Sequence, residues 1–385
     1  MTHGWPRYSQ EALDAVVAVI QSGKVNYWTG QEGKRFEAEF RDYWGAAHAV
    51  GIANGTVTLE LALRASGVGP GDEVIVTPRS FFASASVIQL VGATPVFADV
   101  DRDSQNLTAA TIEPLLTKRT RAILPVHLAG WPCEIDEIVA LADSHDAVVI
   151  EDCAQAHGAK YKGQHVGTFG QFGSFSFCQD KIMSTGGEGG MLLVKNERDY
   201  EFVRSFKDHG KNFEKMKPRP GRFDFHYVHD SFGTNYRMTE MQSAIGRVQL
   251  RKLDDWIQQR RTNSLKRLEH FSSVDIVRAP VPADGIEHAY YKLYVFVEPD
   301  ALHQDWSRDR LVSELNSHGV KVFTGSCPEI YREQAFGSRF SDLQLPVAHE
   351  LGETSLMFLV DPTIDQQTID RDGEVLKDVL ARARR

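Results

Sequence analysis

The sequence lacks the features of a membrane protein or of a secreted, disulfide-bonded one. It has no apolar run close to the roughly 18 residues that cross a bilayer, and its first residues, MTHGWPRYSQEALDAV, do not form a basic-then-apolar signal peptide. The sequence has no CxxC pair, so we expect buried, reduced thiols and not a disulfide or zinc framework at its four cysteines, Cys133, Cys153, Cys178 and Cys327. These absences predict a soluble cytoplasmic protein that has no membrane partner and no metal site.

The chain also lacks an excess of positive charge. It has 43 Lys and Arg residues against 52 Asp and Glu residues, a net charge of -9, which disfavours a nucleic-acid partner. No GxxxxGK[ST] motif occurs, and GGEGG at residues 186–190 does not have the GxGxxG spacing, so ATP and NAD have no motif support. An anionic small substrate stays possible, because it responds to the local field and not to the total charge.

The chain does have a regular alternation of apolar runs and amphipathic segments. With 385 residues it is longer than one hydrophobic core usually serves, so we expect a large domain over residues 1–250 and a small α+β domain over 251–385. From about residue 48, strand-like runs such as HAVGIAN, EVIVTP and DAVVIEDCA are separated by helix-like segments. Strands without polar alternation that are joined by helices predict an α/β domain, in which a mainly parallel sheet is covered on both faces.

Chemically suggestive residues follow three of these predicted strands. They are Asn54-Gly55-Thr56 after GIA, Asp152 at the end of VVIED, and Lys181 after SFSF. Ligands bind at the carboxyl ends of strands in open α/β sheets, so these residues are candidates for one site. Each has an ordinary alternative: Asn54 or Thr56 as a helix cap, Asp152 as a turn cap, and Lys181 as a surface lysine.

Taken together, the three groups fit pyridoxal 5'-phosphate (PLP). A helix N-terminus with small residues presents free N–H groups to a phosphate, and a carboxylate can keep a pyridine ring protonated. A lysine between apolar runs is partly buried, which favours the neutral amine that forms a Schiff base with an aldehyde.

The sequence resembles the PLP-dependent sugar aminotransferases of the DegT–DnrJ–StrS group, which share the fold of aspartate aminotransferase. The matching blocks follow one another over nearly the whole chain: ANGTVTLELALRASGVGPGDEVIV, GATPVFADVD, VIEDCAQAHGAKYKGQHVGTFGQFGSFSF, GGEGGMLLV and GTNYRMTEMQSAIGRVQL. The resemblance implies a three-layer large domain with a mainly parallel, seven-stranded sheet and a smaller α+β C-terminal domain. Where relatives have four residues and then GEGG after the lysine, this chain has the additional Gly186.

The resemblance also implies a role for each matching residue. Lys181 is expected to carry PLP as an internal aldimine, with pyridoxamine phosphate (PMP) as an intermediate, and Asp152 to bind the pyridinium nitrogen. The other cofactor contacts that it implies are Gln155 to the phenolic oxygen, Phe81 stacked on the ring, Ser176, Gly55 and Thr56 at the phosphate, and Asn235 from a partner subunit. Active sites shared in this way imply a homodimer.

Three further residues are candidates for substrate contacts. Arg237 is close to Asn235 in the sequence, and Lys292 occupies a position where many relatives have histidine. Lys211 lies in the segment Arg204–Arg222, which holds seven basic residues against two acidic ones. This segment is either a solvated loop or an arm that meets an anionic substrate.

These expectations describe an aminotransferase that moves an amino group from an amino acid, with L-glutamate implied by the resemblance, to a nucleotide-linked or otherwise anionic keto sugar. Such a reaction belongs to amino-sugar biosynthesis for a surface polysaccharide or a glycosylated metabolite. Two alternatives stay open: a PLP- or PMP-dependent keto-sugar dehydratase, and a regulatory protein on a transaminase fold. Lysine at 181 disfavours the dehydratase, because dehydratases of the group have histidine there.

Overall fold

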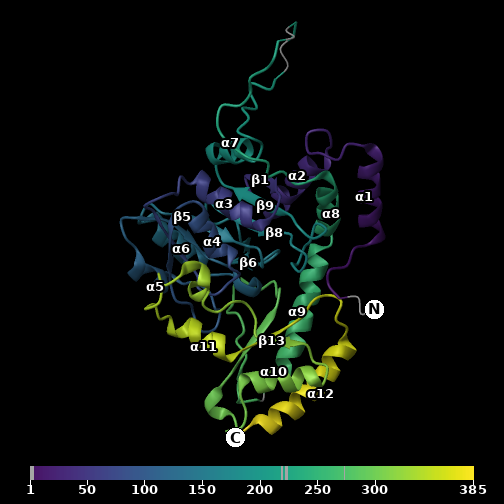
Figure 1. Ribbon diagram of the computed structural model, residues 1–385. Coiled ribbons are helices and arrows are strands. Elements are labelled where there is room, and N and C mark those ends of the chain that lie inside the picture. Colours follow the sequence, from purple (N-terminus) through teal and green to yellow (C-terminus); the bar gives the residue numbers. More distant parts are fainter. Residues whose placement is uncertain (1–3, 218–219, 222–223, 273) are drawn as a thin grey trace.

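A seven-stranded, mainly parallel sheet organises the first part of the chain, as predicted (Figure 1). The computed structural model describes residues 4–217, 220–221, 224–272 and 274–385. The spatial order of the strands is β1-β9-β8-β5-β4-β2-β3, and β9 alone among them runs antiparallel to its neighbours. The strands are β1 (His48–Ile52), β2 (Glu73–Val76), β3 (Thr94–Phe97), β4 (Thr120–Leu124), β5 (Val148–Asp152), β8 (Phe172–Ser176) and β9 (Gly190–Val194).

Helices cover this sheet on both faces. Every residue of β2, β8 and β9 is buried, which requires packing above and below the sheet. The helices of this part are α1 (Gln10–Ser22), α2 (Glu32–Trp44), α3 (Gly55–Ala65), α4 (Ala83–Leu90), α5 (Ala109–Ile112), α6 (Ile135–Asp143), α7 (Glu197–Phe206), α8 (Glu240–Leu250) and α9 (Leu253–Glu269). Short 3₁₀ turns occur at Glu113–Leu115, Leu128–Gly130, Pro299–Ala301, Ile330–Arg332 and Gln334–Phe336.

Two small antiparallel sheets complete the structure. One has the order β10-β12-β14-β13 and the other β11-β6-β7. The strands of the two sheets are β6 (Lys160–Tyr161), β7 (Gln164–His165), β10 (Val277–Arg278), β11 (Ile286–Glu287), β12 (Leu293–Val297), β13 (Val322–Phe323) and β14 (Ser355–Phe358). The remaining helices are α10 (Arg308–Ser317), α11 (Pro346–Thr354) and α12 (Gln366–Ala383).

Strand β12 lies between two hydrophobic cores. Its side chains alternate: Leu293, Val295 and Val297 are buried in the core of the four-stranded sheet. Tyr294 and Phe296 are buried in the larger core, which contains the seven-stranded sheet. Because successive side chains of a strand point to opposite faces, one five-residue strand joins both cores.

The long helical pattern predicted after Met238 is two helices. Helix α8 ends at Leu250 and α9 begins at Leu253, with a turn at Arg251 and Lys252 between them. The strands and helices predicted after residue 290 are confirmed as β12, α10, β13, β14 and α12. The division of the chain into domains at residue 250 stays a prediction.

The segment after α7 projects away from the rest of the chain (Figure 1). Three aromatic side chains on it are largely exposed: Phe225 (76%), Tyr227 (81%) and Phe232 (100%). We call the described residues between 211 and 233 the arm. Arg219 and Arg222, which belong to the predicted basic segment, lie outside the described residues.

No helix in the described ranges combines the length and the apolar character that a bilayer crossing needs.

A buried ion pair joins α9 to α12. Arg267 Nη2 donates to Asp372 Oδ2 at 2.8 Å, and both side chains are nearly inaccessible. We expect Asp372→Asn to lower the free energy of unfolding by about 3 kcal/mol, because it leaves a buried guanidinium without a counter-charge. Urea denaturation followed by circular dichroism measures this loss.

The exposed pair of Arg382 and Glu314 is the control. Glu314→Gln should change the free energy of unfolding by less than about 0.5 kcal/mol. Equal losses in the two variants would contradict the importance of the buried pair.

Candidate active site

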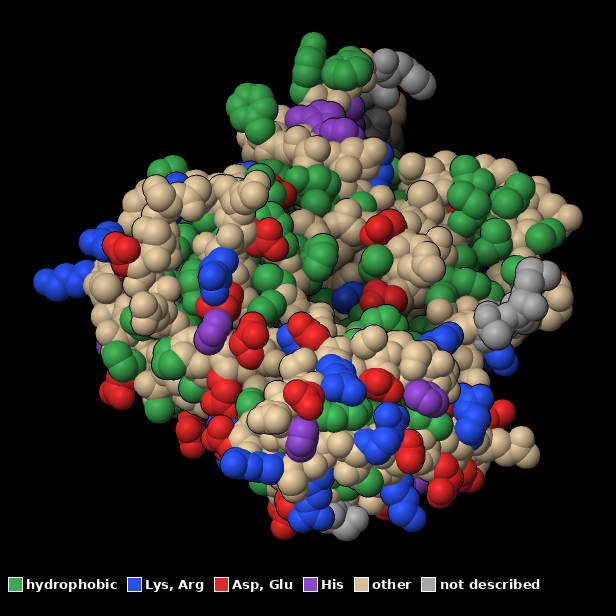
Figure 2. Space-filling model, turned by 60° about the horizontal axis from the view of Figure 1, so that its bottom comes forward, with side chains coloured by type: hydrophobic (Ala, Val, Ile, Leu, Met, Phe, Trp, Pro, Cys, Tyr) green, Lys and Arg blue, Asp and Glu red, His purple; other side chains and the backbone are tan. Residues whose placement is uncertain are grey.

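The three predicted strand ends meet at one cavity of about 980 Å³. Asn54, Gly55 and Thr56 follow β1, Asp152 ends β5, and Lys181 follows β8. Figure 2 shows a hollow in the surface with basic and acidic side chains inside it. Of the predicted site residues, those that line the cavity are Gly55, Thr56, Phe81, Asp152, Gln155, Ser176, Lys181 and Lys292.

Lys181 is half-buried at the wall of the cavity. Within the described ranges, no carboxylate forms an ion pair with its Nζ, which lies 5.1 Å from the ring centroid of Tyr291. The backbone of Lys181 is fixed from two sides: its N–H donates to Cys178 O at 3.1 Å, and its carbonyl accepts from Trp5 Nε1 at 2.7 Å. The backbone is therefore held while the amine stays available.

Asp152 presents a buried carboxylate that has no ion pair within the part of the chain that the structure describes. Its Oδ2 accepts from Ser84 Oγ at 2.8 Å, and its Oδ1 accepts from Ala154 N at 3.1 Å. Burial raises the pKa of Asp152, although both hydrogen bonds and the charge of Lys181 lower it. A cationic N–H group in the cavity would supply the counter-charge that this carboxylate lacks.

The first turn of α3 forms an anion cradle. Asn54 caps the helix by accepting from Val57 N at 3.1 Å, so the Gly55 and Thr56 N–H groups have no partner in the described structure. A Cβ on Gly55 would lie 2.5 Å from Ser176 Cβ. Gly55 and Ser176 are therefore packed closely, and together with Thr56 they line the cavity, where free N–H groups and a hydroxyl suit a phosphate.

Gln155 and Phe81 border the same cavity. Gln155 Oε1 accepts from Ala129 N at 2.7 Å, so its amide is oriented and its Nε2 remains a donor. Phe82 packs edge-on against Phe336 at 5.9 Å between ring centroids, whereas the Phe81 ring is 68% exposed. This contrast favours Phe81 over Phe82 for stacking on a ligand. In the sequence analysis, only the resemblance to the family distinguishes the two residues.

The chemistry of this donor set fits PLP. An amine and a buried carboxylate, neither of them ion-paired in the described part of the chain, lie with an anion cradle around one cavity. They correspond to the aldehyde, the pyridinium nitrogen and the phosphate of that cofactor.

Comparison with known proteins identifies the family. The model of the DegT/DnrJ/EryC1/StrS aminotransferase family matches residues 6–377. The chain belongs to this family.

Solved structures and curated relatives extend this result. The chain is 36% identical to a UDP-N-acetyl-3-dehydro-α-D-glucosamine 3-aminotransferase of Acidithiobacillus ferrooxidans, over 92% of this chain and 90% of that protein. The structure matches an aminotransferase from Psychrobacter cryohalolentis with a TM-score of 0.96 and 46% identity, over 100% of both chains. It also matches a putative sugar aminotransferase of Streptococcus pneumoniae that is solved in a PMP form and a PLP form. Both matches have a TM-score of 0.86 and 25% identity and cover 98% of this chain. They cover 98% of the chain in the PMP form and 97% of the chain in the PLP form.

Asn235, which the resemblance assigns to the family site, and the substrate candidates Arg237 and Lys211 do not line the cavity in this single chain. Lys211 Nζ lies 3.2 Å from Asp208 Oδ1, and Arg237 forms an ion pair with the same buried carboxylate. Asn235 is exposed, and its backbone pairs with that of Asp208. The roles of these three residues stay predictions.

The basic residues of the segment Arg204–Arg222 are largely engaged where the structure describes them. Lys207 pairs with Glu37, Lys215 with Asp230, and Lys217 with Glu214. Arg204 lies over the Phe213 ring at 4.3 Å. These contacts favour the first of the two interpretations of this segment, a solvated loop, over a segment that contacts an anionic substrate.

The glycines after Lys181 are required by the backbone turn. Gly186 and Gly187 have φ values of 88° and 120°, a region that disfavours residues with a Cβ. Among residues 185–190, only Glu188 lines the cavity. The additional Gly186 therefore changes the turn and does not bring backbone to the cavity wall.

Several residues around the cavity are not identified by the sequence reasoning. Tyr291 lines the cavity, and its hydroxyl donates to Asp180, which directly precedes Lys181. Ser84, which binds Asp152, follows Phe81 by three positions, a spacing that could suggest a shared helical face. Trp5 contacts Lys181 from 176 residues away, and no local pattern signals that contact.

A buried cluster beside Asp152 has the residue types of a metal site. It contains His127, Glu151 and Cys153. His127 Nε2 lies 3.0 Å from Glu151 Oε2, and its Nδ1 accepts from Cys133 N at 3.0 Å. Glu151 also accepts three backbone N–H groups, at Gly167, Phe169 and Gly170. These hydrogen bonds engage the imidazole and the carboxylate and hold the end of β5.

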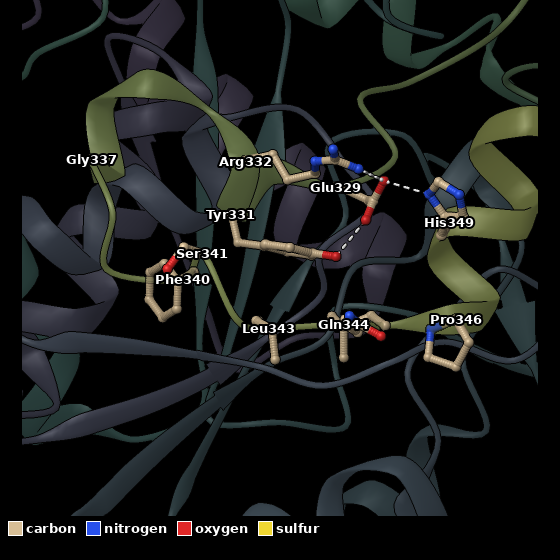
Figure 3. Close-up of a pocket in the computed structure, with 11 residues that line it drawn as sticks. Glu329, Tyr331, Arg332, Gly337, Phe340, Ser341, Leu343, Gln344, Pro346 and His349 are labelled. Carbon is tan, nitrogen blue, oxygen red and sulfur yellow. Dashed lines mark hydrogen bonds and ion pairs between the residues drawn. The ribbon is translucent and has the colours of Figure 1, made fainter.

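A second cavity, of about 620 Å³, lies elsewhere (Figure 3). Its central carboxylate, Glu329, accepts from the Tyr331 hydroxyl and is paired with Arg332 and His349, each at 3.0 Å. The charge of Glu329 is therefore already neutralised by its partners. None of the predicted site residues lines this second cavity. The larger cavity is the candidate active site.

The anion cradle can be tested by adding one methyl group. In Gly55→Ala the new Cβ meets Ser176, so we expect the Kd for PLP to rise at least about tenfold. Titration of the apoprotein with PLP, followed by cofactor absorbance, measures this change. Gly69→Ala is the matched control, because its Cβ would meet nothing closer than 3.9 Å. Equal affinities in the two variants would argue against the cradle.

Proposed function

We propose that this protein is a PLP-dependent aminotransferase that moves an amino group from an amino acid, L-glutamate, to the ketone of a sugar. The observation that carries the proposal is the unpaired amine of Lys181 in the same cavity as the buried carboxylate of Asp152. Membership of the aminotransferase family supports it.

Each cavity residue would hold one part of the cofactor. Asp152 would bind the ring nitrogen, Gln155 Nε2 the phenolic oxygen, and Ser176 with the Gly55 and Thr56 N–H groups the phosphate. The Phe81 ring would cover one face. When bound, PLP supplies an electron-poor ring that stabilises negative charge on the carbon next to the transferred nitrogen.

Lys181 would move the proton. Its Nζ would accept a proton from the carbon that carries the amino group and deliver it within the same site. The hydrogen bond from Trp5 to the Lys181 carbonyl holds the backbone, so the amine can change partners without movement of the chain.

The acceptor is a keto sugar in amino-sugar biosynthesis, for a surface polysaccharide or a glycosylated metabolite. The relative from Acidithiobacillus ferrooxidans is named for a UDP-linked dehydro sugar, which supports a nucleotide-linked acceptor. A cytoplasmic location would suit such a substrate and stays a prediction.

The dehydratase alternative has less support, because position 181 is lysine. A regulatory role also has less support, because the cavity retains the amine, the carboxylate and the cradle together.

We also propose that two copies form a homodimer with shared sites. Asn235 and Arg237 do not line the cavity of their own chain, so they would act in the cavity of a second copy. Exposed apolar side chains support an interface (Figure 2): three on the arm and Leu13, Val17 and Ile20 along one face of α1. PLP binding and dimer formation would then each favour the other.

Reductive trapping tests the role of Lys181. Borohydride reduction of the PLP-loaded protein should leave the cofactor mass on the peptide that contains Lys181, as mapped by mass spectrometry. Lys181→Ala should lose the visible absorbance of the bound cofactor and at least about 10³-fold in kcat. Label on any other lysine would refute the assignment.

Subunit mixing tests the shared site. Lys181→Ala and Asn235→Ala should each be impaired alone, whereas a mixed dimer contains one site with both native residues. After equal amounts of the two variants are unfolded and refolded together, about half of the dimers are mixed, so activity should recover toward about a quarter of that of the native dimer. Refolding each variant alone is the control. No recovery in a mixture that forms dimers would place Asn235 in the site of its own chain.

A further inference from the structure

The candidate cavity is lined by more acidic than basic side chains. Its described lining contains two lysines and four acids: Lys181, Lys292, Asp152, Asp180, Glu188 and Glu333. Lys181 is committed to the carbonyl chemistry. Lys292 is therefore the cation that stays available to bind a negatively charged substrate group.

Lys292 has no counter-ion in the described chain. Its half-buried amine forms no ion pair there, and its Nζ lies 4.7 Å from the ring centroid of Tyr291. Asp180, an acid near it, already accepts the hydroxyl of Tyr291. Asp180 and Asp361 act on this ammonium from a distance but form no ion pair with it in the described chain, so a closer negative partner is expected to arrive with a ligand.

The two cavity lysines share one aromatic ring. The Nζ atoms of Lys181 and Lys292 lie 5.1 Å and 4.7 Å from the centroid of Tyr291. A group bound at Lys292 would therefore lie beside the same aromatic ring that borders the amine of Lys181. In an amino acid, the carboxylate is attached to the same carbon as the amine that is transferred, which matches this proximity.

The backbone that carries Lys292 is held firmly. Tyr290 has φ 48°, a strained value for a residue with a Cβ. Buried Arg260 donates to the carbonyls of Tyr290 and Tyr291, at 3.5 Å and 3.2 Å. Lys292 N donates to Ala129 O at 3.4 Å. The surrounding structure thus maintains a conformation that costs free energy, as binding sites often do.

We propose that Lys292 binds the α-carboxylate of the amino-acid donor. The proposal rests on the aminotransferase function proposed above and adds the residue that recognises the donor. The phosphates of a nucleotide-linked sugar are several bonds from the ketone, so they fit the mouth of the cavity better than a site beside Lys181.

The charged groups around Lys292 make the recognition dependent on pH. Lys181 and Asp180 face it from the segment after β8, Arg260 from α9, Asp361 from the segment after β14, and Tyr291 from its own segment. The pKa of Lys292 is lowered to about 8, mainly by burial; Arg260 and Lys181 also lower it, and Asp180 and Asp361 raise it. The amine is charged below that pH and neutral above it, so carboxylate binding should weaken as the pH rises through 8.

The donor half-reaction tests this without knowledge of the sugar. PLP-loaded protein is mixed with increasing L-glutamate, and the loss of the PLP absorbance gives the half-saturating concentration. Lys292→Met should raise that concentration about 10- to 100-fold, whereas Lys292→Arg should keep it within about threefold. Lys321→Met, which removes an exposed lysine next to β13, should leave it unchanged.

The pH profile separates a binding role from a structural one. In the native protein the half-saturating concentration should rise about tenfold per pH unit above 8, and in Lys292→Arg this rise should be absent. The other titrating groups are common to both proteins, so the difference between the two profiles reports Lys292.

Chemical labelling gives a readout that does not depend on turnover. Acylation of Lys292 in the native protein, quantified by mass spectrometry, should slow at least about threefold with 2-oxoglutarate present, because its carboxylate would cover the amine. This measurement also applies if Lys292→Met fails to load PLP.

Two results would overturn the proposal. The first is an unchanged glutamate dependence in Lys292→Met with slower amination of the keto substrate, which would move the contact to the sugar. The second is equal labelling of Lys292 with and without 2-oxoglutarate. Failure of the native, PLP-loaded protein to react with any amino acid would instead reject the aminotransferase function itself.

Discussion

The parallel pairing of β5 with β8 determines the geometry of the cavity. In this register Asp152 lies opposite Ser174, so the strand that ends in the carboxylate and the strand that leads to Lys181 finish side by side. A shift of one residue would turn the Asp152 side chain to the other face of the sheet. The cradle at β1 depends on the same arrangement, because β1 joins β8 through the antiparallel strand β9. One set of backbone hydrogen bonds therefore positions the amine, the carboxylate and the anion site together.

Uncompensated charge is the second feature of this structure. Arg79 is fully buried, donates to Gln105 and Ser355, and leaves Nη1 without a partner in the described chain. Arg260 leaves Nε and Nη2 without partners in the same way. Asp152 and Lys292, which line the cavity, form no ion pair within the described residues. Such groups reduce stability, and cofactor and substrates that pair with Asp152 and Lys292 would return part of that free energy by binding the folded state.

Features that depend on neighbouring residues in the chain are predictable from the sequence. Strand ends at Gly55, Asp152 and Lys181 follow from apolar runs and the residues after them, and parallel strands bring such ends to one edge. Contacts between distant segments are not predictable in this way. Trp5 reaches Lys181, and Arg260 reaches the carbonyls beside Lys292, only because the tertiary fold brings α9 and the N-terminal segment to the cavity. Asn235 and Arg237 pose a different problem, because a role in a second copy cannot be read from one chain.

The alternation of β12 couples two regions that otherwise have separate cores. Its odd-numbered residues are packed with α10 and α12, while Tyr294 in the same strand forms part of the cavity wall. A rigid strand transmits displacement along both of its faces, so a change of side-chain volume beneath the four-stranded sheet would alter the shape available to a substrate. Substrate preference in this protein can therefore evolve through residues that no substrate ever touches.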